Sequence, residues 1–347
     1  MLDSDDKFVY FNEKIRNYTE SPASPEDLMK LAALPRKRQE WTQNAKVKDE
    51  SVYDFLSKHS GIENKETLYY NLDVLLDATI RSYYAAGASE ISARTCNLTS
   101  NDFHKTYQIK SVKPTYYYKS VNAESISLYA TLSQLGAKSL RFKGGWSILN
   151  SSIISYLQSS GVTVLNSHVD SILDSSRQIL LSDGSLRPFD QIICTTNSQV
   201  LSKIYPKLQF DIPHRTWTIL NLGYENPPHL PGFGYAVPGI ENSNVYSAIF
   251  NYNCFPSNKP TVTLLGTGDH GQILKEFLSQ TNFSYPNMGF SRVLQDSSPQ
   301  YSVGHYLQQE KMLSSKPDWL QIGGHSFFHS GIPSCIIRSK EIVSNLL

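Results

Sequence analysis

The feature that most constrains the fold of this chain is a series of short apolar segments between Trp217 and Leu265. Each has the length and composition of a β-strand, and loops rich in proline, glycine and asparagine separate them. We therefore expect residues 205–265 to be mostly β-sheet, inside a chain of 347 residues that suits one large or two medium domains. The predicted strands are Trp217–Tyr224, Tyr235–Val237, Val245–Asn251 and Thr261–Leu265.

Segments with helical spacing precede this region. Residues Lys65–Tyr84 repeat leucine and isoleucine at intervals of three and four, and Ser51 begins a capping box ahead of a shorter helix. A further helix is predicted over Ala123–Leu135. Phe8–Phe11 is predicted to be a strand. Pro35–Trp41 is predicted to be a solvated basic loop, with a contact to lipid headgroups or a partner as the alternative.

A change of pattern at Leu140 predicts an α/β segment. Gly144 and Gly145 form a turn, and the residues after them place isoleucine and leucine on one face of a helix. An extended stretch, Val162–Val169, follows. Gln191–Thr196 is apolar on both faces, which is typical of a strand buried in a sheet.

Composition and charge exclude several classes of protein. The chain carries 32 Lys+Arg against 31 Asp+Glu and has no dominant basic stripe, so nucleic acid is not an expected partner. No run of about 18 apolar residues is present, so no helix is expected to span a bilayer. The acidic, polar beginning of the chain matches neither a signal peptide nor an Arg-rich transit peptide.

The cysteines and histidines do not predict a metal site. The four cysteines lie far apart without a CxxC pair, which excludes a zinc ribbon and weakly favours a reducing compartment. Cys194 and Cys335 lie in apolar runs and are predicted to be buried thiols. His305, His325 and His329 are not on a clear helix and lack nearby carboxylates, so we expect no metal. Without a GxSxG elbow, no catalytic residue can be named.

One GxGxxG motif occurs, at Gly266–Gly271, between a predicted strand and a predicted helix. A dinucleotide fingerprint needs such glycines so that backbone N–H groups can approach a pyrophosphate. Asp269 would place a carboxylate beside those phosphates, and Pro286 interrupts the route to a second strand. A coincidental turn is therefore the preferred interpretation, and a NAD-dependent dehydrogenase stays as an alternative.

The C-terminal segment combines a strand, a glycine-rich loop and a helix. The strand is predicted over Trp319–Ile322, and Ser330, Gly331 and Ile332 open the helix. Backbone N–H groups in the first turn of a helix point outward, and Pro333 fits there because its missing N–H costs nothing. This geometry suits an anion or a ring, and an ordinary strand–loop–helix connection remains the alternative.

Several of these segments, in the right order, resemble oxygen-dependent protoporphyrinogen oxidase, an FAD-dependent mitochondrial enzyme family. Pro299–His305 (PQYSVGH) is close to a PQYxxGH motif of the family, and Gly232–Pro238 (GFGYAVP) is close to a distinctive middle motif. Phe142–Trp146, Phe189–Cys194 and Gly331–Ile336 extend the match over essentially the whole chain.

The resemblance implies an α/β (mixed α+β) fold class, an incomplete FAD/NAD(P)-binding-type flavin oxidase fold. It implies a mainly helical membrane-associated module over residues 1–138, through which the substrate enters, with a short N-terminal strand. Residues 139–204 and 295–347 would be the remnant of an FAD-binding domain, and residues 205–294 a β-sheet substrate-binding domain.

The resemblance also implies a function and a set of site residues. The activity would be FAD-mediated oxidation of protoporphyrinogen IX in haem biosynthesis, with O₂ as acceptor, at the mitochondrial inner membrane. A tetrapyrrole substrate, peripheral membrane contact and a homodimer are the partners that it suggests. The implied cofactor-binding residues are Val169, Ser330, Gly331 and Ile332, and the implied substrate-binding residues are Phe233, Gly234 and Tyr235.

One departure from the family is large. The family begins with a βαβ unit bearing GxGxxG, whereas the match here starts near Phe8. Losing about three charge-assisted bonds to the pyrophosphate, at about 1.5–3 kcal/mol each, lowers FAD affinity by roughly three to six orders of magnitude. The chain is therefore expected to be an N-terminally incomplete form with impaired FAD binding. A non-catalytic paralogue that binds porphyrin or a partner is the alternative.

A second departure concerns the substrate. The family's arginine for the substrate carboxylate has no counterpart after the N-terminal strand. Arg16, Arg36 and Arg38 are nearby but unaligned.

Overall fold

The computed structural model describes residues 8–17, 20, 22–42, 48–96, 144–210, 212–227, 229–255, 260–328 and 331–346. The chain divides into two compact units, Met1–Pro114 with Gln191–Leu347, and Thr115–Asp190. The helix predicted over Ala123–Leu135 lies outside the described residues. The domain boundaries that the resemblance implied remain predictions.

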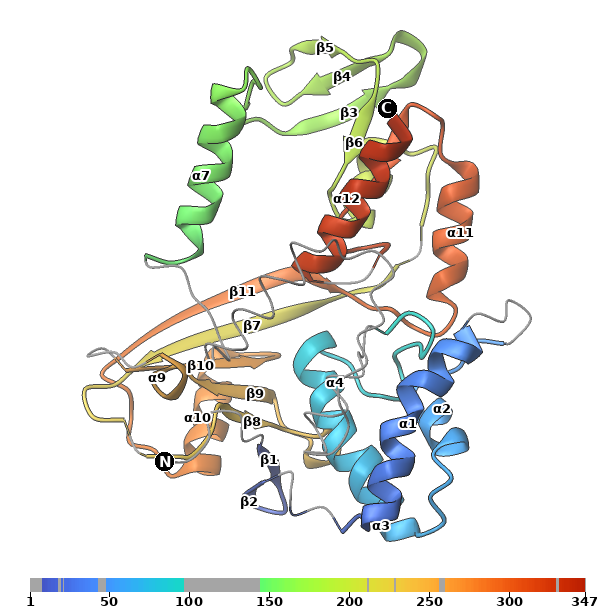
Figure 1. The fold of residues 1–347 in the computed structure, drawn as a ribbon. Helices are drawn as coiled ribbons and strands as arrows, with labels where there is room; N and C mark the ends of the chain where they lie inside the picture. Colours follow the sequence, from blue (N-terminus) through green and yellow to red (C-terminus); the bar gives the residue numbers. More distant parts are fainter. Residues whose placement is uncertain are drawn as a thin grey trace. The chain divides into compact units, whose positions relative to one another are not determined.

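A seven-stranded sheet dominates the first unit, in the order β11-β7-β10-β9-β8-β1-β2 (Figure 1). All neighbours are antiparallel except β1 and β8. The four strands predicted between Trp217 and Leu265 and the one at Phe8–Phe11 are confirmed. Their bounds are β1 (Phe8–Phe11), β2 (Lys14–Asn17), β7 (His214–Gly223), β8 (Gly234–Ala236), β9 (Val245–Phe250), β10 (Thr261–Gly266) and β11 (Met288–Pro299).

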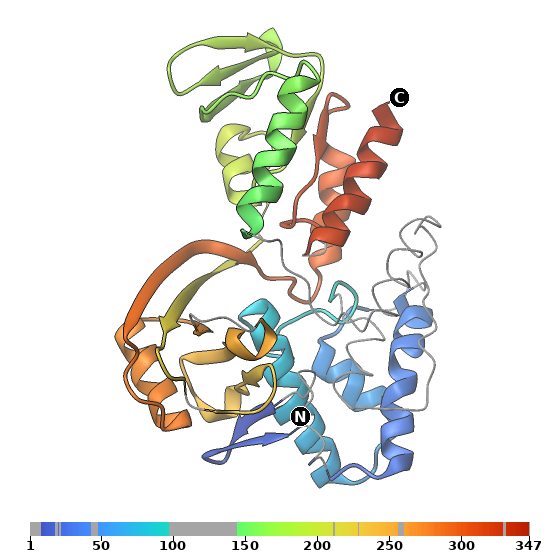
Figure 2. The same cartoon turned by 60° about the vertical axis from the view of Figure 1, so that its left-hand side comes forward.

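One face of this sheet is covered by helix α10 (His270–Thr281). Ile273 and Phe277 of the helix are fully buried against Leu220, Leu222 and other alternate strand residues. This alternation follows from the two-residue period of a strand, which sends successive side chains to opposite faces. Figure 2 shows the curl of the long β7–β11 pair at one edge of the sheet. Two short elements connect the strands, η4 (Gly239–Glu241) and α9 (Asn251–Cys254).

A second core lies among the N-terminal helices. The basic segment Pro35–Trp41 is not a loop, as the sequence suggested, but part of α1 (Pro25–Thr42). The helix buries Leu31 and Leu34, and the partly buried guanidinium of Arg38 donates to the carbonyls of Ala93, Arg94 and Cys96. These tertiary contacts outweigh the cost of an internal proline. The other helices are α2 (Val52–His59), α3 (Lys65–Tyr69), η2 (Tyr70–Leu76) and α4 (Asp77–Tyr84).

The helix predicted over Lys65–Tyr84 is confirmed, with a π-helical stretch, η2, inside it. Leu72 and Leu75 of this stretch are fully buried in the N-terminal core. The capping box at Ser51 is also confirmed, because its hydroxyl accepts the Asp54 N–H at 3.0 Å.

The C-terminal part of the first unit is built on a parallel pair of strands. Strand β12 (Leu320–Ile322) pairs with β6 (Ile192–Cys194) in register. The interpretation of Gln191–Thr196 as a strand buried on both faces is wrong, because only Cys194 of this run is buried and Ile193 is 48% exposed. Three helices accompany the pair: α8 (Ser198–Ile204), α11 (His305–Ser315) and α12 (Ile332–Leu346).

The second unit is described from residue 144 to residue 190. Helix α7 (Trp146–Ser159) confirms the predicted helix, but none of its side chains is buried. The extended stretch Val162–Val169 contributes only Val169 to a strand. The remaining elements are β3 (Val169–Leu173), η3 (Asp174–Ser176), β4 (Gln178–Leu181) and β5 (Leu186–Pro188). Across the ranges described in both units, no helix has the length and apolar character needed to cross a membrane.

Candidate functional site

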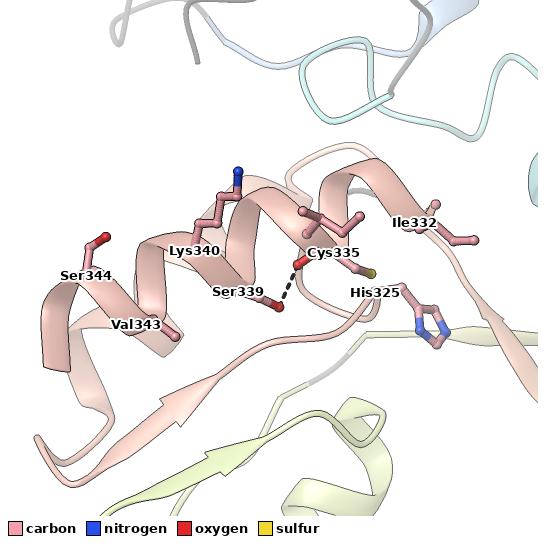
Figure 3. Close-up of a pocket in the computed structure, with 9 residues that line it drawn as sticks. His325, Ile332, Cys335, Ser339, Lys340, Val343 and Ser344 are labelled. Carbon is pink, nitrogen blue, oxygen red and sulfur yellow. Dashed lines mark hydrogen bonds between the residues drawn. The ribbon is translucent and has the colours of Figure 1, made fainter. Parts of the chain in front are cut away.

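An open groove of about 860 Å³ runs along helix α12 (Figure 3). Its volume lies in the range typical of small-molecule and cofactor sites. The groove begins at the first turn of the helix and follows one side of it, because its residues recur at intervals of three and four. They are His325, Gly331, Ile332, Cys335, Ile336, Ser339, Lys340, Val343 and Ser344.

The opposite face of α12 fixes the helix to the sheet. Ile342 is buried, and the guanidinium of Arg338 donates to the Ile322 carbonyl at 3.2 Å, beside the β12–β6 pair. The same guanidinium lies 4.2 Å from the centre of the Phe328 ring, which favours a cation–π interaction. The helix is therefore held from one side, and the groove residues remain open on the other.

The turn after β12 requires its glycines. Gly323 donates its N–H to the Cys194 carbonyl at 2.9 Å, which extends the pairing of β12 with β6. Gly324 has φ +81°, and a Cβ there would lie 2.8 Å from the Thr195 carbonyl oxygen. A side chain would clash with that backbone, so the close approach depends on glycine.

The PQYSVGH segment holds the loop that borders the groove. The Tyr301 hydroxyl donates to the His325 carbonyl, and the side-chain amide of Gln309 donates to the Phe327 carbonyl. His305 is buried and donates from Nε2 to the same Phe327 carbonyl at 3.1 Å. The motif therefore acts as a support, since its side chains satisfy buried carbonyls of this loop instead of facing a ligand.

A second histidine supports the same loop from the start of β7. The Nδ1 of His214 donates to the Ile212 carbonyl at 2.9 Å, which leaves Nε2 to accept from the Ser326 hydroxyl at 3.2 Å in the neutral ring. Phe327 is fully buried against the edge of Phe210. The loop over residues 325–328 is thus fixed by polar and aromatic contacts from two elements.

The start of α12 can donate hydrogen bonds into the groove. Gly331 has φ +101°, and its carbonyl accepts the Cys335 N–H at 3.2 Å. Ile332 is 55% exposed, and Pro333 has no N–H to satisfy. First-turn N–H groups and the positive end of the helix dipole suit an electron-rich ring edge or an anion.

The predicted cofactor residues fall in three places. Gly331 and Ile332 line the groove, and their contact with a cofactor stays a prediction. Ser330 lies outside the described residues. Val169 begins β3 in the second unit.

The three predicted substrate residues lie at the start of β8 and differ in environment. Phe233 is 42% exposed, whereas Tyr235 is buried and its hydroxyl donates to the Gln280 side chain at 2.6 Å. Gly234 has φ +153°, and a Cβ there would lie 2.0 Å from the Ala248 carbonyl oxygen. The Tyr235 ring belongs to the core beneath the sheet, so it is not a surface on which a ligand can lie.

The Gly266–Gly271 motif is a strand–turn–helix, but its anion site is filled by the chain itself. Asp269 caps α10 and accepts the N–H of Gly271 at 2.8 Å and that of Gln272 at 3.2 Å. These are the donors that a phosphate would need. Strands β10 and β11, which flank α10 in the chain, each pair with the antiparallel strand β7 that lies between them, so they are not the adjacent parallel strands of a dinucleotide-binding βαβ unit. The geometry argues against the dehydrogenase alternative.

Other groove residues were missed or misjudged from the sequence. Cys335 was expected to pack in an apolar core, but it is only half-buried and projects from α12 toward the loop that bears His325 (Figure 3). His325 was considered only as a metal ligand. The sequence did contain a signal for these groove residues. It is the spacing of Ser339, Lys340 and Val343, which places them on one side of the terminal helix.

The partly buried tyrosines of the β-sheet do not supply acid–base chemistry. Burial raises the pKa of Tyr224 and of Tyr252 to about 12. Burial also raises the pKa of Tyr235 well above its ordinary value, and the Tyr10 hydroxyl adds to this. All three phenols are therefore neutral at physiological pH, and their burial in or beside the core makes them structural.

Comparison with known proteins places the fold. No protein-family description and no curated protein matches the sequence. Among solved structures, a proposed protoporphyrinogen oxidase from Exiguobacterium sp. 255-15 has 12% sequence identity and a TM-score of 0.66, over 99% of this chain and 80% of that chain.

Two further structures show the same architecture. The A394C mutant of putrescine oxidase has 10% identity and a TM-score of 0.57, over 99% of this chain and 81% of that one. Reduced UDP-galactopyranose mutase has 13% identity and a TM-score of 0.55, over 92% of this chain and 71% of that one. The mixed α/β fold of this chain is thus the fold that these solved structures share.

The groove fits one part of a flavin better than the other. Its apolar wall and its exposed helix start suit a flat ring with carbonyl groups. For the pyrophosphate half, the parallel strands β6 and β12 lie far apart in the chain, so together they do not form the βαβ unit that carries a dinucleotide fingerprint. The described residues therefore offer a site for the ring, without a matching site for the dinucleotide.

Proposed function

We propose that this chain belongs to a flavin-dependent oxidase that converts protoporphyrinogen IX to protoporphyrin IX. The reaction removes six electrons and six hydrogens in three steps, and three O₂ accept them to give three H₂O₂. The flavin, when bound, accepts the electron pairs from the substrate and passes them to O₂.

The observation that carries the proposal is the groove at the start of α12 together with the segment that supports it. Tyr301 and His305, which belong to the most family-specific motif, hold the loop beside the groove through His325 and Phe327. The motif and the C-terminal segment are separate in the sequence and meet at this one place. The similarity of fold to FAD-dependent oxidoreductases supports the same reading.

The roles of the residues follow from the groove. Ile336 and Val343 exclude water from one side of the ring, and the N–H of Ile332 can donate to a ring carbonyl. Lys340 brings a positive charge to the groove, which stabilises negative charge that develops on a bound ring. No side chain of the groove needs to act as a strong acid or base.

A matched pair of variants tests the proposal. Ile336→Trp fills the groove, whereas Ile337→Trp places the same ring on α12 at a residue that does not line it. With FAD supplied in excess, we expect the unmodified chain and Ile337→Trp to form fluorescent protoporphyrin and H₂O₂ from protoporphyrinogen IX. We expect Ile336→Trp to lose at least tenfold in rate. Equal rates in both variants would place the flavin elsewhere.

The cellular setting is proposed from the resemblance alone. We place the protein at the mitochondrial inner membrane in peripheral contact with the bilayer, as a homodimer, with residues 1–138 as the membrane-facing module. An apolar tetrapyrrole favours entry from a bilayer. Fractionation of mitochondria with a carbonate wash, followed by cross-linking, tests these three points.

A second candidate function follows from the missing dinucleotide turn in the β6–β12 pair. A non-catalytic relative would bind porphyrin without a flavin. It predicts quenching of porphyrin fluorescence by a protein that shows no flavin absorbance and forms no H₂O₂ when FAD is added.

A further inference from the structure

The seven-stranded sheet ends in β11, and no described strand pairs with the outer edge of β11 (Figure 1). Because β11 pairs only with β7, on its inner side, alternate residues direct their N–H and C=O groups outward. Three apolar side chains of this edge strand are exposed. They are Met288 at 72%, Phe290 at 65% and Val293 at 48%. An edge strand with these features is suited to pair with another strand.

The two edges of the sheet differ in how they are protected. At the opposite edge, β2 is four residues long and carries Lys14 and Arg16, which disfavours pairing with a further strand. At this edge, the stretch Met288–Leu294 of β11 is longer and contains neither lysine nor proline. Self-association of the chain is therefore expected at β11 and not at β2.

A bulge limits the part of β11 that can pair. The strand matches β7 residue for residue from Met288 to Leu294, and pairing resumes only at Ser298. Residues 295–297 therefore break the line of the edge, as bulges on edge strands do. A further strand can thus follow β11 over Met288–Leu294, and the middle of this stretch is Ser291.

This stretch complements itself when two copies run antiparallel about Ser291. Residues that face each other across antiparallel strands lie on the same side of the sheet. Phe290 then faces Arg292 of the second copy, and the two-fold axis repeats this contact. Both side chains are exposed and lie on the side away from α10, where they can form a cation–π contact. On the other side Val293 faces Gly289, which has no side chain to oppose it.

Neighbouring registers are less favourable. If the axis passed at Arg292, the two guanidinium groups would face each other, and like charges opposite one another destabilise a strand pair. If it passed at Phe290, Leu294 would face Pro286, which has no N–H to donate. The register centred on Ser291 uses the whole stretch and avoids both contacts.

We propose that this edge is an interface between two copies of the chain, joined by antiparallel pairing of their β11 strands about Ser291. Backbone hydrogen bonds hold the two strands together, and the two contacts between Phe290 and Arg292 fix the register. The sheet then continues from one protomer into the other, and no open β11 edge remains. This interface supplies the homodimer proposed above, and it requires neither flavin nor substrate.

Two substitutions of the same exposed ring test the register. Phe290→Arg places a guanidinium opposite Arg292 of the second copy, whereas Phe290→Glu places a carboxylate there. Sedimentation velocity of the full chain at increasing concentration measures self-association. We expect the unmodified chain and Phe290→Glu to dimerise. Phe290→Arg should weaken the dimer at least about tenfold, because two like-charge pairs replace two attractive ones.

A pair of cysteines tests the same register by covalent capture. When Phe290→Cys and Arg292→Cys proteins are mixed and treated with oxidised glutathione, a disulfide should join the two species, because the two positions lie opposite each other. A mixture of Phe290→Cys with Arg187→Cys, at an exposed position of β5, is the matched control and should cross-link much more slowly. The unmodified chain shows the contribution of its own Cys254 and Cys335, which are partly buried.

A bilayer is the other candidate occupant of this edge, and vesicles of phosphatidylcholine are the probe for it. Phe290→Arg and Phe290→Glu remove the same ring, so a purely apolar contact would be weakened equally by both. Equal loss of self-association in the two variants would overturn the interface. An unmodified chain that stays monomeric, whether or not it binds the vesicles, would also overturn it, and so would a control mixture that cross-links as fast as the paired one.

The outcomes separate this interface from the proposed function. If the chain dimerises as expected but does not oxidise protoporphyrinogen IX with excess FAD, the interface stands and the oxidase proposal fails. If oxidation occurs in a chain that stays monomeric, the oxidase proposal stands and the interface fails. Urea unfolding curves at low protein concentration should be the same for both Phe290 variants and the unmodified chain, because this ring is 65% exposed.

Discussion

Gly234 shows at the scale of one residue how closely two strands approach. Its φ of +153° is one that side chains rarely adopt, and a Cβ would lie 2.0 Å from the Ala248 carbonyl oxygen. We predict that Gly234→Ala lowers the free energy of unfolding by at least about 2 kcal/mol, because strain and a backbone clash add. Urea unfolding followed by Trp217 fluorescence measures it.

The control for this prediction is a glycine with a positive φ but with space around it. Gly61 has φ +69°, and the nearest atom to its Cβ position is the Lys30 Cδ at 3.9 Å. Gly61→Ala should therefore cost only the backbone term, about 1 kcal/mol. Equal losses in both variants would show that the close approach at Gly234 does not matter.

Glu276 gives stability a dependence on pH. Burial would raise the pKa of its carboxyl, but hydrogen bonds from Asn244, Ser243 and Gln272 outweigh burial and hold the pKa below the ordinary 4.5. The stability that these bonds add is present above the unfolded-state pKa and is lost as the pH falls through the folded-state pKa.

We therefore predict that Glu276→Gln is less stable than the unmodified chain at pH 7 and that the difference shrinks below about pH 4. Urea midpoints measured from pH 3 to pH 7 test this. A difference that stays constant over this range would mean that Glu276 acts through its shape alone.

Single residues also show which structural roles can be predicted from the sequence. Asp269 was read correctly as an obstacle to phosphate, because a carboxylate beside glycine N–H groups is a local feature. Pro35 was misread as part of a loop, because what keeps it helical is distant: Arg38, one turn later, is fixed by the chain near Ala93. Cys335 was misread because its neighbours in sequence are apolar, whereas its neighbours in space leave a groove.

At the scale of elements, the loop over residues 325–328 depends on the segment from Tyr301 to Gln309. We predict that Tyr301→Phe removes the hydrogen bond to the partly buried His325 carbonyl and lowers the free energy of unfolding by about 1 kcal/mol. Amide exchange should become faster over residues 325–328, and flavin affinity should fall with it.

Tyr306→Phe is the matched control for this prediction. Tyr306 lies on α11, and its ring faces the Arg94 guanidinium at 4.6 Å, but its hydroxyl makes no described hydrogen bond. Removing that hydroxyl should leave exchange over residues 325–328 unchanged. If Tyr301→Phe and Tyr306→Phe behave alike, the motif does not hold the loop.

Helices and strands were predictable where the spacing of apolar residues along the chain is enough to define them. Strands β7 and β10 alternate between buried and half-buried residues, and the helix over Lys65–Tyr84 repeats leucine and isoleucine at helical spacing, so both were found from the sequence. The groove along α12 was not found, because it depends on how the loop that bears His325 packs beside the helix.

At the scale of the whole molecule, the order of motifs indicated the fold before any coordinates did. The structure shares that fold with proteins of 10–13% sequence identity, which shows how little of the sequence it requires. Substrate and location do not follow from the fold, because the same architecture supports unrelated chemistry. They depend on the residues that line the groove at α12.

The whole chain should bind the ring half of a flavin dinucleotide and gain little affinity from the other half. The groove can hold a ring, whereas the turn at Gly266–Gly271 is capped by Asp269 and the β6–β12 pair is not a βαβ unit. The adenosine and pyrophosphate of FAD then add little to binding, so we predict that FAD and FMN bind within about tenfold of each other, a difference of about 1.4 kcal/mol or less.

Quenching of flavin fluorescence, titrated with FAD, FMN and riboflavin at constant salt, measures the three affinities. Ile336→Trp should weaken all three by the same factor, since each places its ring in the same groove. An FAD affinity a hundredfold or more above that of FMN would require a dinucleotide site within this chain. In that case the chain would bind the pyrophosphate through contacts other than a βαβ turn, and a ring site at α12 would still be needed to explain the effect of Ile336→Trp.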